Sequence, residues 1–189
     1  MIVVIALVMV LLGFMEGSYG SGLKFRWWTE LLVFLLFGPV FTSGFQLGIG
    51  LSVDFESLFL GVVSGWLAAF VIHIRNFEAI MVNDQAGISN SVQSLGFESS
   101  KKLLRFWWVC LVLLMDAYHW FFAHDVWLVA FVLISMALSL LMFKVIRSIQ
   151  SPVSSKYRPA LAHTYRLTLV LMALWGVENL SYLIWKEIG

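Results

Sequence analysis

The chain has 189 residues, of which 61% are hydrophobic and 12% are charged, and its mean hydropathy is +0.91. A soluble domain is nearer to about half apolar and about a quarter charged, so lipid is expected to be the solvent for part of this chain. The net charge of +1 gives no reason to expect a nucleic-acid partner, and the single cysteine, Cys110, excludes a disulfide framework and a thiolate metal site.

Six apolar stretches predict membrane-spanning helices within one domain, residues 1–189. In chain order they are 2–16, 28–50, 55–74, 104–122, 126–143 and 166–185. All but the first are long enough to cross about 30 Å of hydrocarbon. The first lacks the basic start and small-residue cleavage site of a signal peptide, so we expect a retained helix. Long apolar runs are unlike alternating barrel strands, and the predicted fold class is therefore an all-α polytopic membrane protein.

The second stretch contains Pro39, in the sequence FGPVFTSG. Proline removes a backbone donor from a helix and frees a carbonyl group. We therefore expect a kinked helix, with Thr42 and Ser43 near enough to satisfy freed carbonyls.

The charged residues of the connections alternate in sign along the chain. The first, third and fifth connections carry every basic residue except Lys186, whereas the second and fourth carry only the acids Asp54, Glu56 and Asp125. The positive-inside rule therefore predicts that the segment 75–103 is cytoplasmic and that both termini face outward, most simply in a bacterial inner membrane. Several tryptophans near span ends are expected to form an aromatic belt: Trp27, Trp28, Trp107, Trp108, Trp120, Trp127 and Trp185.

The longest polar segment, residues 75–103, offers candidate ligands for a metal–diphosphate site. Such a site needs carboxylates with amide or water ligands beside them, and cations for the phosphates. The candidate ligands are Asn76, Glu78, Asn83 and Asp84, and the candidate cations are Lys24 and Arg26. Glu78 and Asp84 are six residues apart, which on a single helix would place them off a common face. Composition alone favours a solvated loop with helix caps.

Three acids lie within or at the edges of the predicted spans: Glu30, Asp116 and Glu178. A charged group in the bilayer usually marks a site or a pairing. Glu30 is close enough in sequence to Lys24 and Arg26 to pair with them. Asp116 and His119 are expected on one helix face, with Glu178 at a similar depth. This outer polar cluster is more often structural than catalytic.

Two segments carry a family resemblance. In residues 13–40, a Gly-rich bend precedes Leu23-Lys24-Phe25-Arg26, then Thr29-Glu30, then Phe37-Gly38-Pro39. Residues 75–96 read RNFEAIMVNDQAGISNSVQSLG, with Ala86-Gly87 and Leu95-Gly96 as fixed points. Together they resemble the UbiA superfamily of membrane prenyltransferases, and most closely its dihydroxynaphthoate branch in menaquinone synthesis. The resemblance implies helices four to nine of a nine-helix bundle, and the second segment corresponds to the family's second acidic motif.

The departures from that motif decide what the resemblance implies about function. Enzymes of the family hold Mg²⁺ and an isoprenyl diphosphate with two acidic motifs, and the first motif belongs to the half that this resemblance does not cover. In the alignment, the two aspartates of the second motif fall on Ala79 and Asn83, and its lysine falls on Ile88. The resemblance thus implies a catalytically degenerate, half-length protein. We expect an accessory subunit or isoprenoid-lipid binder, completed by a second copy or another membrane chain.

Two other functions stay open. Glu78 and Asp84 are each one position from the lost aspartates, so the chain could be the C-terminal half of a split aromatic prenyltransferase, for which Mg²⁺ would be the cofactor. The third alternative is a small transporter or channel built on Asp116, His119 and Glu178, although nothing resembles an inverted repeat.

Overall fold

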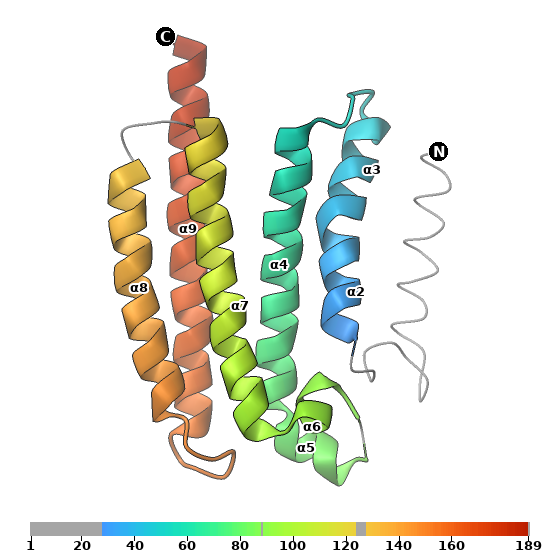
Figure 1. Ribbon diagram of the computed structural model, residues 1–189, viewed down its shortest axis with the longest axis vertical. Coiled ribbons are helices and arrows are strands. Elements are labelled where there is room, and N and C mark those ends of the chain that lie inside the picture. Colours follow the sequence, from blue (N-terminus) through green and yellow to red (C-terminus); the bar gives the residue numbers. More distant parts are fainter. Residues whose placement is uncertain (1–27, 88, 124–127, 189) are drawn as a thin grey trace. The chain divides into compact units, whose positions relative to one another are not determined.

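The computed structural model describes residues 28–87, 89–123 and 128–188, and the regular elements in these ranges are all helical (Figure 1). The elements are α2 (Thr29–Leu35), the π-helical turn η2 (Leu36–Val40), α3 (Phe41–Gly48), α4 (Phe55–Glu78), α5 (Ile80–Gln85), α6 (Ser91–Leu95), α7 (Phe97–Tyr118), the π-helical turn η3 (His119–Ala123), α8 (Leu128–Ser148) and α9 (Tyr157–Ile188). The chain divides within α7 into two compact units, residues 1–104 (unit 1) and residues 105–189 (unit 2).

Four helical stretches in the described residues are long and apolar enough to cross a membrane. They are Thr29–Gly48, Phe55–Glu78, Val129–Ser148 and Tyr157–Leu180, and they overlap four predicted spans. The predicted span 2–16 lies outside the described residues. The predicted span 104–122 is helical as α7 and η3 but is not among the four. The all-α class and its membrane character are thus confirmed for the described residues, whereas the count of six is not.

The predicted kink at Pro39 is confirmed. Gly38 leaves helical geometry, with φ −107° and ψ −114°, inside the turn η2 that joins α2 to α3. The hydroxyl of Ser64 on α4 lies 3.3 Å from the carbonyl oxygen of Phe37 and 3.1 Å from that of Gly61 in its own helix. A hydroxyl that can donate to a carbonyl group at the kink therefore comes from the neighbouring helix, whereas the sequence suggested Thr42 or Ser43.

Glycines bring α2 and η2 into close contact with α4. A Cβ atom added at Gly65 would lie 2.3 Å from the carbonyl oxygen of Phe34, and one added at Gly38 would lie 2.6 Å from the carbonyl oxygen of Gly61. Gly61 and Gly65 are four residues apart on α4, which is the spacing at which small residues let membrane helices pack backbone against backbone. There is no room for a side chain at this crossing.

Helix α4 begins at an acidic cap. The carboxylate of Asp54 accepts hydrogen bonds from the hydroxyl of Ser57 and from its backbone N–H, the latter at 2.8 Å. The Ser57 hydroxyl first, and then its N–H, hold the pKa of Asp54 below the usual value. Arg75 lies in the last turn of the same helix.

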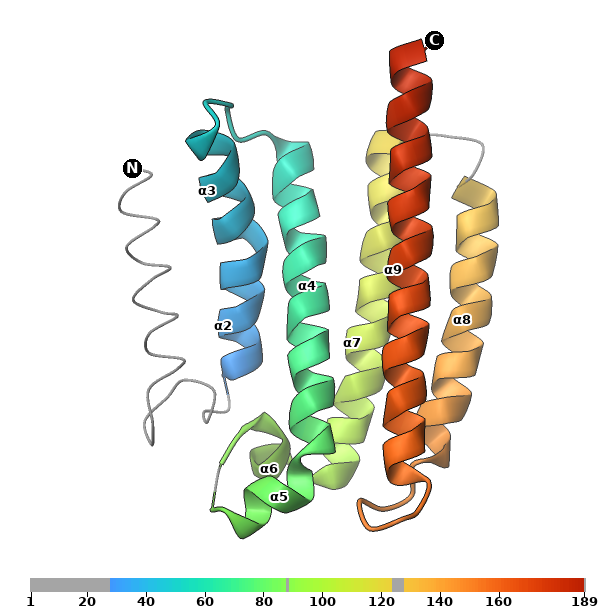
Figure 2. The ribbon, with the colours of Figure 1, turned by 180° about the vertical axis from the view of Figure 1, so that it is seen from behind.

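The segment 75–103 is more ordered than the solvated loop that its composition favours. It contains the end of α4, helices α5 and α6, and the first turns of α7, and Figures 1 and 2 show α5 and α6 beside the C-terminal end of α4. Asn90 caps α6 by accepting hydrogen bonds from the N–H groups of Val92 and Gln93 at 2.9 and 3.2 Å. Gly87 and Gly96, whose φ angles are 66° and 77°, follow α5 and α6 in the left-handed conformation that glycine favours.

Unit 2 contains α8, α9 and the part of α7 from Arg105 onward. Trp108 of α7 is fully buried, and its indole N–H donates to the Ser139 hydroxyl of α8 at 3.0 Å. Met142 of α8 and Leu161 of α9 are also fully buried. The expectation that Trp108 lies in an interfacial belt is therefore wrong, since its ring is a core residue; Trp120, in contrast, is 61% exposed.

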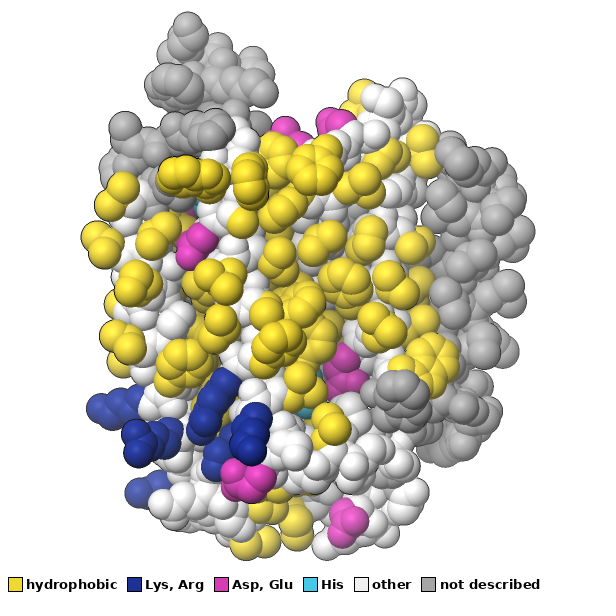
Figure 3. Space-filling view, in the orientation of Figure 1, with side chains coloured by type: hydrophobic (Ala, Val, Ile, Leu, Met, Phe, Trp, Pro, Cys, Tyr) yellow, Lys and Arg dark blue, Asp and Glu magenta, His cyan; other side chains and the backbone are white. Residues whose placement is uncertain are grey.

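Large apolar side chains are exposed on the helices of both units. Examples are Phe41 and Phe45 on α3, Leu133 and Leu140 on α8, and Leu169 on α9. Figure 3 shows such apolar side chains across one face, with Lys and Arg side chains gathered over one end of α7 and α8. Apolar exposure on this scale fits helices whose surroundings are lipid or other membrane helices.

Candidate functional site

A buried polar cluster in unit 1 is centred on Glu30 of α2. Its Oε1 atom lies 3.1 Å from Nδ1 of His73 and accepts hydrogen bonds from Nδ2 of Asn76, at 3.3 Å, and from the hydroxyl of Ser91. The His73 side chain is fully buried and that of Glu30 is 7% exposed. One carboxylate oxygen thus ties α2 to both α4 and α6; we call Glu30, His73, Asn76 and Ser91 the Glu30 cluster.

The acceptors in the Glu30 cluster indicate where its protons lie. Nε2 of His73 is 3.1 Å from the backbone carbonyl oxygen of Ser100, which can only accept, so Nε2 carries a proton. Oε1 of Glu30 accepts from Asn76 and Ser91 and lies within hydrogen-bond distance of Nδ1 of His73, so three side chains share this one oxygen.

The second carboxylate oxygen of Glu30, Oε2, is buried and has no hydrogen-bond partner in the part of the chain that the structure describes. Lys24 and Arg26, which the sequence suggests as partners, lie outside the described residues. Within the described ranges, the partners of Glu30 come from α4 and α6.

The four candidate ligands of the segment 75–103 lie in different environments. Asn76 belongs to the Glu30 cluster. Glu78, the last residue of α4, and Asp84 on α5 are both exposed, and Asn83 on α5 is partly buried. In the described ranges, no three His, Cys, Asp or Glu side chains are grouped closely enough to hold a metal ion. The structure therefore directs Asn76 toward Glu30 and leaves Glu78 and Asp84 at the surface.

A second buried histidine–carboxylate pair lies in unit 2. Nε2 of His119, in η3, is 3.2 Å from Oε2 of Glu178 on α9, and the two side chains are 0% and 6% exposed. The rings of Phe131, Tyr118 and Trp175 lie around the imidazole, with centroid distances of 5.0, 5.6 and 6.5 Å. This polar pair in an aromatic surrounding ties the end of α7 to α9.

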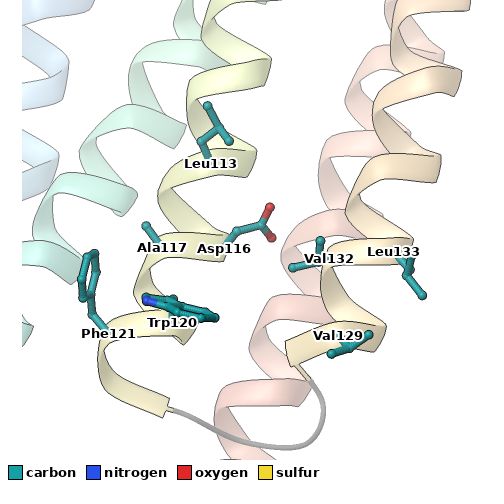
Figure 4. A pocket seen from close by; sticks show the side chains of 8 residues that line it. All are labelled: Leu113, Asp116, Ala117, Trp120, Phe121, Val129, Val132 and Leu133. Atoms are coloured by element: carbon teal, nitrogen blue, oxygen red, sulfur yellow. The ribbon is translucent and has the colours of Figure 1, made fainter.

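Asp116, expected on one helix face with His119, lies beside α8. The hydroxyl of Ser135 on α8 is 3.3 Å from its carboxylate and 2.9 Å from the Val132 carbonyl oxygen, so its single proton can serve either acceptor. Asp116 also lines an open groove of about 490 Å³ between α7 and α8, whose other walls are apolar and include Trp120, Val132 and Leu133 (Figure 4). The π-helical turn η3 begins at His119, directly after the end of α7. His119 thus lies beside Glu178, and Asp116 lies beside Ser135.

Sequence reasoning does not place His73 and Ser91 in a site. His73 precedes Asn76 by three residues, so the two share a face of α4 that turns toward Glu30. The sequence contained two signals for this contact. Glu30 is an acid at the edge of one predicted span and needs a partner, and His73 lies inside the next predicted span. The Ser91 contact depends on the fold of α5 and α6 and has no sequence signal.

Comparisons of the chain with protein-family models, with curated proteins and with solved structures found no match.

Proposed function

We propose that this chain is a catalytically degenerate UbiA-like membrane protein that acts as an accessory subunit or as an isoprenoid-lipid binder. The observation that carries the proposal is the residue at the turn between α4 and α5. Ala79 stands there, where the motif that residues 75–96 resemble has a metal-binding aspartate. Alanine offers no side-chain oxygen, and Asn83, at the other aspartate position, offers only a neutral amide.

The contacts between the two resembling segments support this proposal. Glu30 of the segment 13–40 bonds with Asn76 and Ser91 of the segment 75–96. Gly87 and Gly96, two of the fixed points of the resemblance, follow helices in a conformation that favours glycine. These contacts are compatible with the frame of a diphosphate-binding loop whose two ligand positions, Ala79 and Asn83, lack carboxylates.

The surfaces of α2 and α3 support a role that needs a partner in the membrane. Phe37, Phe41 and Phe45 are 58%, 53% and 60% exposed, and they recur every four residues along one side of the kinked helix. Such a row can pack against a second copy, another membrane protein or an apolar isoprenoid chain, each of which would cover it. We propose a bacterial inner membrane, with α5 and α6 on the cytoplasmic side.

A transfer assay tests the catalytic part of this proposal. The chain is reconstituted in vesicles with Mg²⁺, an isoprenyl diphosphate and an aromatic acceptor such as dihydroxynaphthoate. We expect no prenyl transfer above that of protein-free vesicles, because the described residues provide no carboxylate pair at Ala79 and Asn83. Mg²⁺-dependent transfer that disappears in the Glu78→Ala and Asp84→Ala variants would contradict the proposal.

The split prenyltransferase is the second candidate, and the exposure of Glu78 and Asp84 is the observation that favours it. Both carboxylates are accessible to a second chain that would bring the first acidic motif. Adding such a chain to the same vesicles decides between the two readings. Transfer that needs both chains and Glu78 or Asp84 would support the split enzyme, and its absence would support the degenerate protein.

The orientation is tested with single cysteines in the segments that precede and follow α4, at Ser52 and at Gln85 in α5. In a Cys110→Ala background, we expect Gln85→Cys to react with a membrane-impermeant maleimide only from the cytoplasmic side, and Ser52→Cys only from the outside. Gln85 and Ser52 are both exposed, so the two positions differ in side of the membrane and not in accessibility. Labelling of Gln85→Cys from outside intact cells would overturn the proposed topology.

A further inference from the structure

A groove in unit 2 combines two arginines with an apolar wall. It has a volume of about 510 Å³ and lies between α7, which contributes Arg105, Phe106 and Val109, and α8, which contributes Phe143 and Arg147. We propose that this groove binds an anionic glycerophospholipid. The phosphate would lie at the two guanidinium groups, and the part of an acyl chain nearest the headgroup would lie along the rings of Phe106 and Phe143. This proposal is independent of the UbiA-like reading.

The order of the groove residues along the two helices matches an amphiphilic ligand. Val109 follows Arg105 by four residues on α7, and Phe143 precedes Arg147 by four residues on α8. Four residues correspond to about 6 Å along a helix, so the apolar residues lie about one turn further from the charged end than the arginines do. A phospholipid has the same order, with its charge at the surface and its chains about one helical turn deeper.

The charges around the groove favour an anion. Neither Arg105 nor Arg147 forms an ion pair in the described part of the chain. On α7, Glu98 pairs with Lys101, and Asp116 lies eleven residues beyond Arg105, about 16 Å along the helix. Figure 3 shows further Lys and Arg side chains gathered at this end of the helices.

The residue types favour a lipid phosphate over a free anion. Arginine presents a planar fork of donors that fits phosphate oxygens, and two arginines can hold one phosphodiester between them. Phe106 and Val109 are 54% and 37% exposed, and a free phosphate would leave them uncovered. Basic pockets between membrane helices near the anionic leaflet are recognised sites for acidic headgroups. The acyl chain of a bound phospholipid covers the apolar wall, and the phosphate of the same lipid neutralises the charge of the arginines.

The test uses the full chain in detergent micelles that contain equal amounts of phosphatidylglycerol and phosphatidylcholine with identical acyl chains. Native mass spectrometry counts the lipids that stay bound. We expect a preference for phosphatidylglycerol that falls about tenfold in the Arg105→Gln/Arg147→Gln variant. The Lys156→Gln/Arg158→Gln variant removes the same charge from exposed residues of the same unit that do not line the groove, and it should keep the preference.

Four results would overturn the proposal. Equal losses in the two double variants would assign the preference to general surface charge, and an unchanged preference in the arginine variant would exclude the groove. Displacement of the lipid by glycerol phosphate would show that a free phosphate suffices. The single Arg147→Gln variant is expected to fold even if the double variant does not, because Arg147 is exposed in the last turn of α8. Its preference for phosphatidylglycerol should fall about threefold, and an unchanged preference in this folded variant also contradicts the site.

Discussion

The Glu30→Ala variant is expected to lose about 1–3 kcal/mol of unfolding free energy, because it leaves buried hydrogen-bonding groups without a partner. Nδ1 of His73, Nδ2 of Asn76 and the hydroxyl of Ser91 would lose the carboxylate oxygen that they share. The measurement is unfolding of the purified chain in mixed micelles by increasing SDS, followed by circular dichroism. Glu30→Gln should lose less, since its amide oxygen can still accept from Asn76 and Ser91.

The chain offers a matched control for this prediction. Glu98 forms an ion pair with Lys101 at 3.3 Å, but its side chain is 67% exposed. An exposed pair of this kind contributes less than about 1 kcal/mol, so Glu98→Ala should change the midpoint little. If Glu98→Ala loses as much unfolding free energy as Glu30→Ala, burial does not increase the contribution of the Glu30 cluster to stability.

A double-mutant cycle separates the Glu30–His73 pair from other effects of each substitution. We expect the Glu30→Ala/His73→Ala variant to be more stable than the sum of the two single losses predicts, by about 1–3 kcal/mol. The reason is that the second substitution removes the group that the first leaves buried and unpaired. Additive losses, within about 0.5 kcal/mol, would show that the two side chains do not stabilise one another.

Composition and local sequence pattern were enough to predict the parts of the fold that do not depend on contacts between helices. The apolar runs 28–50 and 55–74 match Thr29–Gly48 and Phe55–Glu78 within a few residues, and Pro39 marks the kink. Each of these features follows from solvation of the backbone in lipid or from the missing N–H of proline. Because they need no knowledge of neighbouring helices, the sequence alone predicts them.

The features that the sequence missed depend on contacts between helices. Composition favoured a solvated loop for residues 75–103, yet α5 and α6 pack against the end of α4, and Ser91 reaches Glu30. The same holds for Trp108, whose place in the core follows from Ser139 on α8. A position near a span end is compatible with a membrane interface and with a core, and only the packing decides which one applies.

The sequence did not predict the π-helical turn that starts at His119, directly after the end of α7. Asp116 lies beside Ser135 of α8, whereas His119 lies against Phe131 of α8 and 3.2 Å from Glu178 of α9. These partners depend on the packing of three helices, so the spacing of Asp116 and His119 alone could not predict them.

The glycine crossing between α2 and α4 leads to the second large prediction. The Gly65→Ala variant should lose about 1–3 kcal/mol of unfolding free energy, because the new Cβ has no space. It would lie 2.3 Å from the Phe34 carbonyl oxygen and 2.9 Å from Cα of Gly38, and both are backbone atoms that cannot rotate away. The helices must therefore move apart, which outweighs the gain of about 1 kcal/mol that alanine brings to a helix.

Gly176→Ala in α9 is the control for Gly65→Ala, because both glycines lie inside helices and a Cβ at Gly176 meets nothing within 4 Å. We expect the Gly176→Ala variant to be as stable as the parent chain or more stable by up to about 1 kcal/mol. Equal stability of Gly65→Ala and the parent in the same SDS titration would contradict the close crossing.

The two large predictions are coupled through α2, which carries both Phe34 at the crossing and Glu30 in the buried cluster. If Gly65→Ala pushes α2 away from α4, the Glu30 carboxylate also moves away from His73. The Gly65→Ala/Glu30→Ala variant should then lose less than the sum of the single losses, because part of the Glu30 contribution is already gone in Gly65→Ala. Additive losses would mean that the crossing adjusts locally at Phe34 and leaves the Glu30 cluster in place. Non-additivity would show that the glycine spacing on α4 positions the acid that links the two segments.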